Sequence, residues 1–139
     1  MGGGFNTNYR EENLISRLES SRQSAWGRQI HQLGECTEEL AQRLAMKLVD
    51  AKLIETTNQR DIEDALAAYL NDLLQAEDFE IQYVISPIRN LAPRPNRISL
   101  YITAQIIERL IDHRAVVDIY GADEEIYAAV NQEVARFIK

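Results

Sequence analysis

Three arginines near the middle of the chain have the side chains and the spacing best suited to binding a partner. Arg89, Arg94 and Arg97 fall within nine residues that contain no acid, and two prolines stiffen the segment between them. A guanidinium presents planar donors that match a carboxylate or a phosphate. The spacing therefore predicts a partner-binding site for an acidic protein surface or for phosphates. The alternative is a solvated connector whose arginines pair with acids of the same chain.

Aromatic residues near the N-terminus form a second candidate site. Trp26, with Tyr9 and Phe5, lies on a predicted N-terminal segment where aromatic side chains could dock a protein partner. Packing of Trp26 into the core is the alternative. The sequence thus predicts Trp26 as a partner-binding residue, together with the three arginines.

Residues typical of enzymes and metal sites lack the spacing that either chemistry needs. His31 and His113 have no second histidine or cysteine at a ligand spacing, and no glycine-rich phosphate loop follows a strand. His113 lies beside Asp112, which could orient it as a base, but a histidine at a helix end more simply compensates the helix dipole. We therefore predict a protein that is not an enzyme, with no catalytic residue, no metal and no cofactor.

Composition describes one domain with an uneven distribution of charge. The chain has 139 residues, 45% of them hydrophobic and 27% charged, and its net charge is −7. The acidic excess lies in residues 36–82, with eleven acids against four bases. A single cysteine, no apolar run long enough for a bilayer and no signal-like start predict a cytoplasmic protein that does not bind membranes.

Hydrophobic periodicity predicts an all-α fold of about five helices. Two short β-branched segments, residues 53–56 and 115–120, are expected to pair as a small β-ribbon. We expect a flexible tail over residues 1–8 and a single helical domain over residues 9–139. Its predicted parts are an N-terminal helix at 9–35, a first helix pair at 37–76, a connector at 77–97 and a second helix pair at 98–139.

Local signals set the expected boundaries within this domain. Gly34 and Thr37 predict the end of one helix and the N-cap of the next, and Thr57 and Asn58 are the two candidates for a further N-cap. Apolar and polar residues alternate from Phe79 to Ile85, which predicts an extended segment inside the connector.

The two predicted helix pairs have similar sequences. Leu48-Val49-Asp50 matches Leu110-Ile111-Asp112, and each is followed by an extended segment and an acidic helix. This similarity predicts an internal repeat whose two units pack together, and the alternative is chance likeness between amphipathic helix pairs.

Residues 37–139 resemble domain-of-unknown-function family 507, a bacterial family, in forms with two helix-pair units. The residues that carry the resemblance are Leu48 to Asp50 through Ile54-Glu55 with Asp61-Ile62, and Ile102-Thr103 through Leu110-Ile111 with Val116 to Tyr120. The resemblance implies a small, mostly helical cytoplasmic protein of bacteria, and it implies no activity or cofactor.

Abundant apolar rows without a reactive cluster favour an interaction or scaffold protein that self-associates or joins a larger assembly. The alternative is a nucleic-acid-associated regulatory protein that uses Arg89, Arg94 and Arg97. Net negative charge argues against it, because phosphate binding needs several cations on one face. We therefore expect protein partners, which include further copies of this chain, and no nucleic acid.

Overall fold

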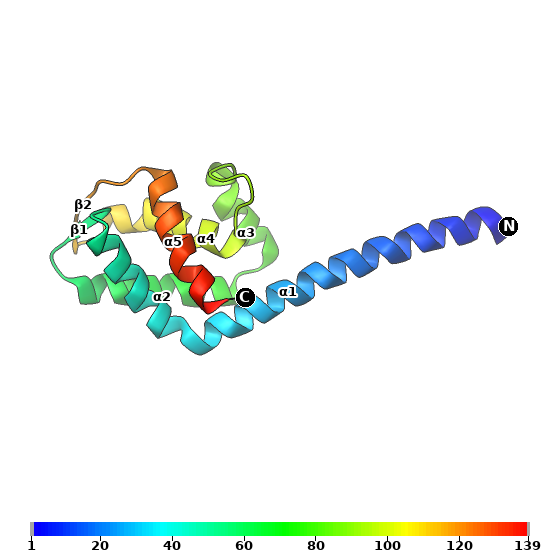
Figure 1. The fold of residues 1–139 in the computed structure, drawn as a ribbon, viewed down its shortest axis with the longest axis horizontal. Helices are drawn as coiled ribbons and strands as arrows, with labels where there is room; N and C mark the ends of the chain where they lie inside the picture. Colours follow the sequence, from blue (N-terminus) through cyan, green and yellow to red (C-terminus); the bar gives the residue numbers. More distant parts are fainter. Residues whose placement is uncertain (1, 139) are drawn as a thin grey trace.

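Helices make up most of the structure, which is a computed structural model that describes residues 2–138, with side chains from residue 26 onward. Figure 1 shows a body of packed helices from which the N-terminal part of the first helix extends. In chain order the elements are α1 (Gly2–Asp50), β1 (Ile54–Thr56), α2 (Gln59–Gln75), α3 (Asp78–Ile85), a 3₁₀ turn (Ser86–Ile88), α4 (Arg97–Arg109), a second 3₁₀ turn (Leu110–Asp112), β2 (Val116–Ile119) and α5 (Asp123–Phe137). The predicted all-α fold is confirmed.

The two strands pair as the sequence predicted. β1 and β2 are antiparallel, with Ile54 opposite Ile119 and Glu55 opposite Asp118. Each strand connects two helices, so the chain forms the unit helix, strand, helix twice. A ribbon this short is marginal alone, and the helices beside it supply the burial that it lacks.

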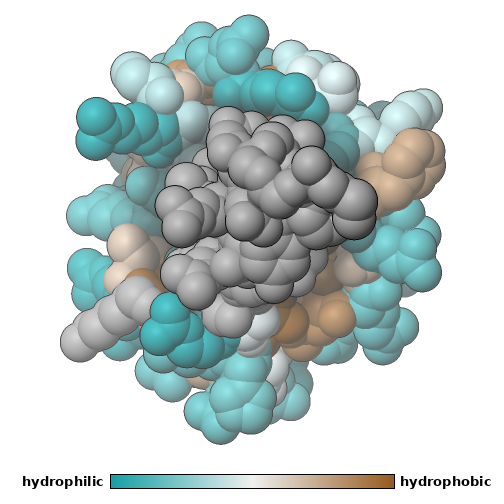
Figure 2. Space-filling model, turned by 90° about the vertical axis from the view of Figure 1, so that its right-hand side faces the viewer, coloured by the Kyte–Doolittle hydropathy of each residue, from teal (hydrophilic) through white to brown (hydrophobic). Residues whose placement is uncertain are grey.

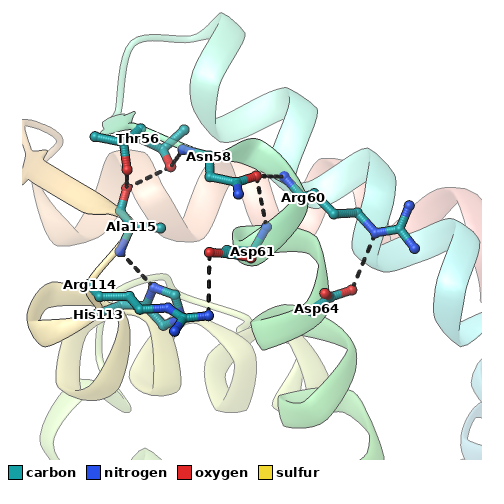
Figure 3. Close-up of polar contacts among 9 residues, drawn as sticks. Thr56, Asn58, Arg60, Asp61, Asp64, His113, Arg114 and Ala115 are labelled. Carbon is teal, nitrogen blue, oxygen red and sulfur yellow. Dashed lines mark hydrogen bonds and ion pairs between the residues drawn. The ribbon is translucent and has the colours of Figure 1, made fainter.

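Side chains at the end of the ribbon fix the start of α2. The Thr56 hydroxyl donates to the carbonyl of Ala115 at 2.7 Å, which ties the two units together. Two residues beyond the predicted strand end, Asn58 Oδ1 accepts hydrogen bonds from the backbone N–H groups of Arg60 and Asp61 (Figure 3). The predicted N-cap is therefore confirmed, and it satisfies amide groups that have no partner inside the helix.

One hydrophobic core joins both units. Leu48 and Leu66 in the first unit and Leu110 and Val130 in the second are all fully buried. α1 packs against α2 and α5, while α4 packs against α2, α3 and α5. Every residue of α4 from Ile98 to Ile106 is buried, so α4 lies at the centre of the body.

The predicted break between two N-terminal helices lies at Cys36, where α1 kinks between two helical segments. Cys36 has non-helical angles (φ −134°, ψ 24°), and helix resumes directly after it. Thr37 is not an N-cap: its hydroxyl donates back to the Leu33 carbonyl at 2.8 Å, and the Cys36 thiol donates to the Gln32 carbonyl at 3.1 Å. Side chains thus supply hydrogen bonds to carbonyls at the kink, where the two helical segments of α1 meet.

The predicted extended segment inside the connector is also wrong, because residues 78–85 form α3. Its alternating pattern fits a helix equally well: Phe79 and Tyr83 are four residues apart, and so are Ile81 and Ile85. Each pair therefore lies on one helical face. Ile81 and Ile85 are buried in the core, which selects the helix over a strand.

α1 begins and ends differently from its predicted bounds. It begins at Gly2, so the predicted flexible tail is wrong from that residue onward. The helix extends this far because adding residues to an existing helix is easier than nucleating a new one. At the other end, Lys52 has a φ of 58°, and the N–H groups of Lys52 and Leu53 donate to Val49 and Leu48. These bonds form a Schellman motif that turns the chain into β1.

Among the described residues, no helix is long and apolar enough to cross a membrane.

Candidate functional site

Helix α3 presents two aromatic side chains to solvent. Phe79 is 79% exposed and Tyr83 is 77% exposed, and they lie one helical turn apart, away from the buried Ile81 and Ile85. On the side of the molecule that carries α3, Figure 2 shows a mainly hydrophilic surface interrupted by separate hydrophobic areas. Two adjacent exposed aromatics on such a surface add nothing to the core and are suited to contact with another molecule.

A cavity of about 470 Å³ opens beside these aromatics, between α2, α3 and α4. Its wall includes both exposed rings. The residues that give it chemical character are Asp72 from α2, Phe79, Glu80 and Tyr83 from α3, and Tyr101, Gln105 and Arg109 from α4. The cavity therefore combines aromatic faces with groups of both charges.

The cation in the cavity wall is already paired, whereas one carboxylate is not. Arg109 Nη1 lies 3.1 Å from Asp72 Oδ2, and the guanidinium also lies 5.8 Å from the centre of the Tyr69 ring. Among the described residues, Glu80 has neither an ion pair nor a hydrogen bond through its side chain. The cavity thus carries a net negative charge.

Burial governs the polar residues at the inner wall. It raises the pKa of Tyr101, and Asp72 raises that pKa further, while Arg109 and a hydrogen bond from Gln105 lower it. Gln105 is only 2% exposed. Its Oε1 atom has no hydrogen-bond partner in the described part of the chain. A buried acceptor without a donor is uncommon in folded proteins, and it calls for a specific explanation.

Two of the predicted binding residues lie in contact with each other. The Arg97 guanidinium lies 4.8 Å from the centre of the Trp26 ring, and Arg97 also forms an ion pair with Asp78. Arg97 therefore links α1, α3 and α4. Trp26 packs partly against the core, so its contacts agree with the packing alternative as well as with the binding one.

The other two predicted arginines lie apart from this contact. Arg89 donates to the side-chain oxygen of Gln82 at 3.0 Å, and Arg94 is exposed and has no polar partner among the described residues. The three guanidinium groups thus have three different environments. The side chains of Phe5 and Tyr9, the other aromatic candidates, lie outside the described residues.

The histidine considered as a base forms a contact within a turn. His113 Nδ1 accepts the backbone N–H of Ala115 at 3.1 Å (Figure 3). The neighbouring Arg114 lies 3.6 Å from Asp61, in the first turn of α2. The part of the chain that the structure describes contains no group of three or more residues arranged to hold a metal ion.

Sequence reasoning missed Phe79 and Tyr83 as candidate binding residues. The available signal was their spacing of four residues, which places both on one face of a helix. Their exposure depends on which face of α3 contacts α4, and local spacing alone does not specify it.

No family model, curated protein or solved structure matches this chain. The resemblance of residues 37–139 to domain-of-unknown-function family 507 therefore stays a prediction.

Proposed function

We propose that this protein is a non-enzymatic cytoplasmic interaction protein that binds a protein partner through α3. The observation that carries the proposal is the pair of exposed aromatics, Phe79 and Tyr83, at the mouth of the cavity. Aromatic side chains bury a large area when a partner covers them, and tyrosine is enriched among the residues that dominate binding energy.

The surroundings of the pair support a specific contact rather than general stickiness. An aromatic residue beside a concave, partly polar surface can both fill space and help to fix the orientation of a partner. The nucleic-acid alternative has less support. Arg97 already pairs with Asp78, so two arginines remain, and salt-dependent phosphate binding needs more.

Site-specific photo-cross-linking in the native cell tests the proposal. A benzophenone amino acid introduced at Phe79 should give a discrete cross-linked product with one protein, and Tyr83→Ala should reduce its yield. The matched control is the same probe at Val117, which is 57% exposed and lies on β2, far from α3 in Figure 1.

The mass of the product identifies a partner or a second copy of the chain. Equal cross-linking at positions 79 and 117, or none at position 79, would contradict the proposal. A product from position 79 alone that depends on Tyr83 would support it.

A further inference from the structure

Resting on the proposed function, we infer that the cavity beside α3 binds the guanidinium group of an arginine on the protein partner. Four features of the wall favour this group, and they concern charge, aromatic faces, an unused acceptor and size.

Charge selects a cation. Asp72 and Glu80 face a single positive group, Arg109, which is paired with Asp72 at 3.1 Å. Glu80 keeps a carboxylate with no cationic neighbour among the described residues. An incoming cation would form an ion pair with Glu80, whereas the Glu80 carboxylate would repel an anion.

Aromatic faces favour a flat cation. Phe79 and Tyr83 are exposed on their α3 face, and Tyr101 lies in the cavity wall. A guanidinium stacks on such rings through the attraction between a cation and the electrons of the ring face. The protein itself uses this contact three times within the described residues: Arg97 lies over Trp26, Arg109 over Tyr69 and Arg43 over Phe137.

The unused acceptor adds a hydrogen-bond partner to the stacking surface that favours arginine over lysine. Gln105 Oε1 is buried and lacks a donor, and Glu80 offers acceptors at the mouth of the same cavity. A guanidinium carries five N–H groups in a rigid plane, so one group can donate in two directions at once. A small shift of the Gln105 side chain toward the cavity, with the arginine inserted, would supply the missing donor. The cavity volume of about 470 Å³ is ample for this group.

The partner is thus a protein segment with an accessible arginine. A second copy could supply Arg94, which is exposed between Pro93 and Pro95. We favour a different protein, because the unpaired carboxylate and the aromatic faces select the chemistry of arginine and nothing in the cavity is specific to the Arg94 loop.

Nuclear magnetic resonance titration of the full chain tests the inference. The probe is a short peptide with one central arginine, capped at both ends, and the control peptide carries citrulline, which has nearly the same shape without the charge. The arginine peptide should shift the signals of Glu80, Tyr83 and the Gln105 side-chain amide saturably. The citrulline peptide should bind about tenfold or more weakly, which corresponds to about 1.4 kcal/mol.

Variants of exposed residues separate the contributions and leave the fold intact. Glu80→Gln removes the charge and keeps the shape, and Tyr83→Leu removes the ring and keeps an apolar side chain. Each should weaken arginine-peptide binding by several-fold, whereas Arg94→Ala should leave it unchanged. The Glu80 effect should shrink at high salt, because salt screens charge pairs near the surface.

Distinct outcomes would overturn the inference and the proposed function. No saturable shift at the cavity, equal binding of both peptides, or an unchanged affinity in Glu80→Gln would refute the arginine site. Cross-linking through Phe79 together with any of these results would leave the proposed function standing. Loss of cross-linking to the partner in Arg94→Ala, with a product of twice the chain mass in the wild type, would show that a second copy is the occupant.

Discussion

Replacement of Arg97 by alanine should weaken the contact between the body and the base of the projecting part of α1. Arg97 is the first residue of α4, and its guanidinium contacts Trp26 of α1 and Asp78 of α3. The described part of the chain offers no other side chain that links these three helices through polar or ring contacts. Arg97→Ala removes both contacts at once and leaves the core residues of α4 unchanged.

The magnitude follows from the exposure of each contact. The Arg97 side chain is 35% exposed, so its contact with the Trp26 ring is expected to contribute about 1 kcal/mol. Asp78 is largely exposed, and its ion pair should contribute less than about 1 kcal/mol. A cation in the first turn of α4 opposes the helix dipole, and its removal returns a few tenths of a kcal/mol. The expected loss in free energy of unfolding is therefore about 1 kcal/mol.

Fluorescence provides a direct assay, because Trp26 is the single tryptophan of the chain. Arg97→Ala should shift Trp26 emission to longer wavelength and increase its quenching by acrylamide, since the ring loses its cover. Arg97→Lys should give an intermediate result, because the charge stays but the flat stacking surface is lost. Arg94→Ala is the matched control and should leave the emission unchanged.

Two results would refute this reasoning. If Arg97→Ala left Trp26 emission and the unfolding midpoint unchanged, the contact would contribute nothing in solution. If Arg94→Ala shifted the emission as much as Arg97→Ala, the effect would come from the loop as a whole rather than from the Arg97 contact.

Three further predictions concern stability. Lys52→Gly should raise the free energy of unfolding relative to Lys52→Ala by about 0.5–1 kcal/mol in urea titrations, because the φ of 58° suits glycine; an equal or lower stability would contradict this. Leu66→Ala should cost about 2–5 kcal/mol, against less than about 0.5 kcal/mol for Val117→Ala at an exposed site, and a near-zero loss for Leu66 would contradict the core assignment. Burial raises the pKa of Tyr69 and of Tyr101 in the folded state. The two neutral side chains therefore contribute fully to the free energy of unfolding below the ordinary tyrosine pKa of about 10, and this contribution is lost as pH rises through their folded-state pKa values. Alkaline unfolding should therefore be less steep with pH in Tyr69→Phe, and an unchanged pH dependence would count against this cause.

Local signals in the sequence determined most of the helices. Hydrophobic periodicity over residues 37–76 and the cap at Asn58 correctly predicted α2, because periodicity and capping act within a few residues. The acids at the start of α5 predicted its first turn for the same reason. Pairing of β1 with β2 was predicted from their β-branched content. Each short strand needs a partner for its backbone hydrogen-bonding groups, and the rest of the chain is mostly helical.

Tertiary contacts decided the remaining features. Residues 79–85 satisfy a strand pattern and a helix pattern equally, and contact of Ile81 and Ile85 with the core selected the helix. The same contact determined that Phe79 and Tyr83 face solvent beside Gln105, which lies on another helix. Arg97 met Trp26 across 70 intervening residues of sequence for a related reason: the packing of α1 and α4 on a shared core brings them together. Periodicity shows that a helix has two faces, but only the distant residues that cover one of them determine which face remains for a partner.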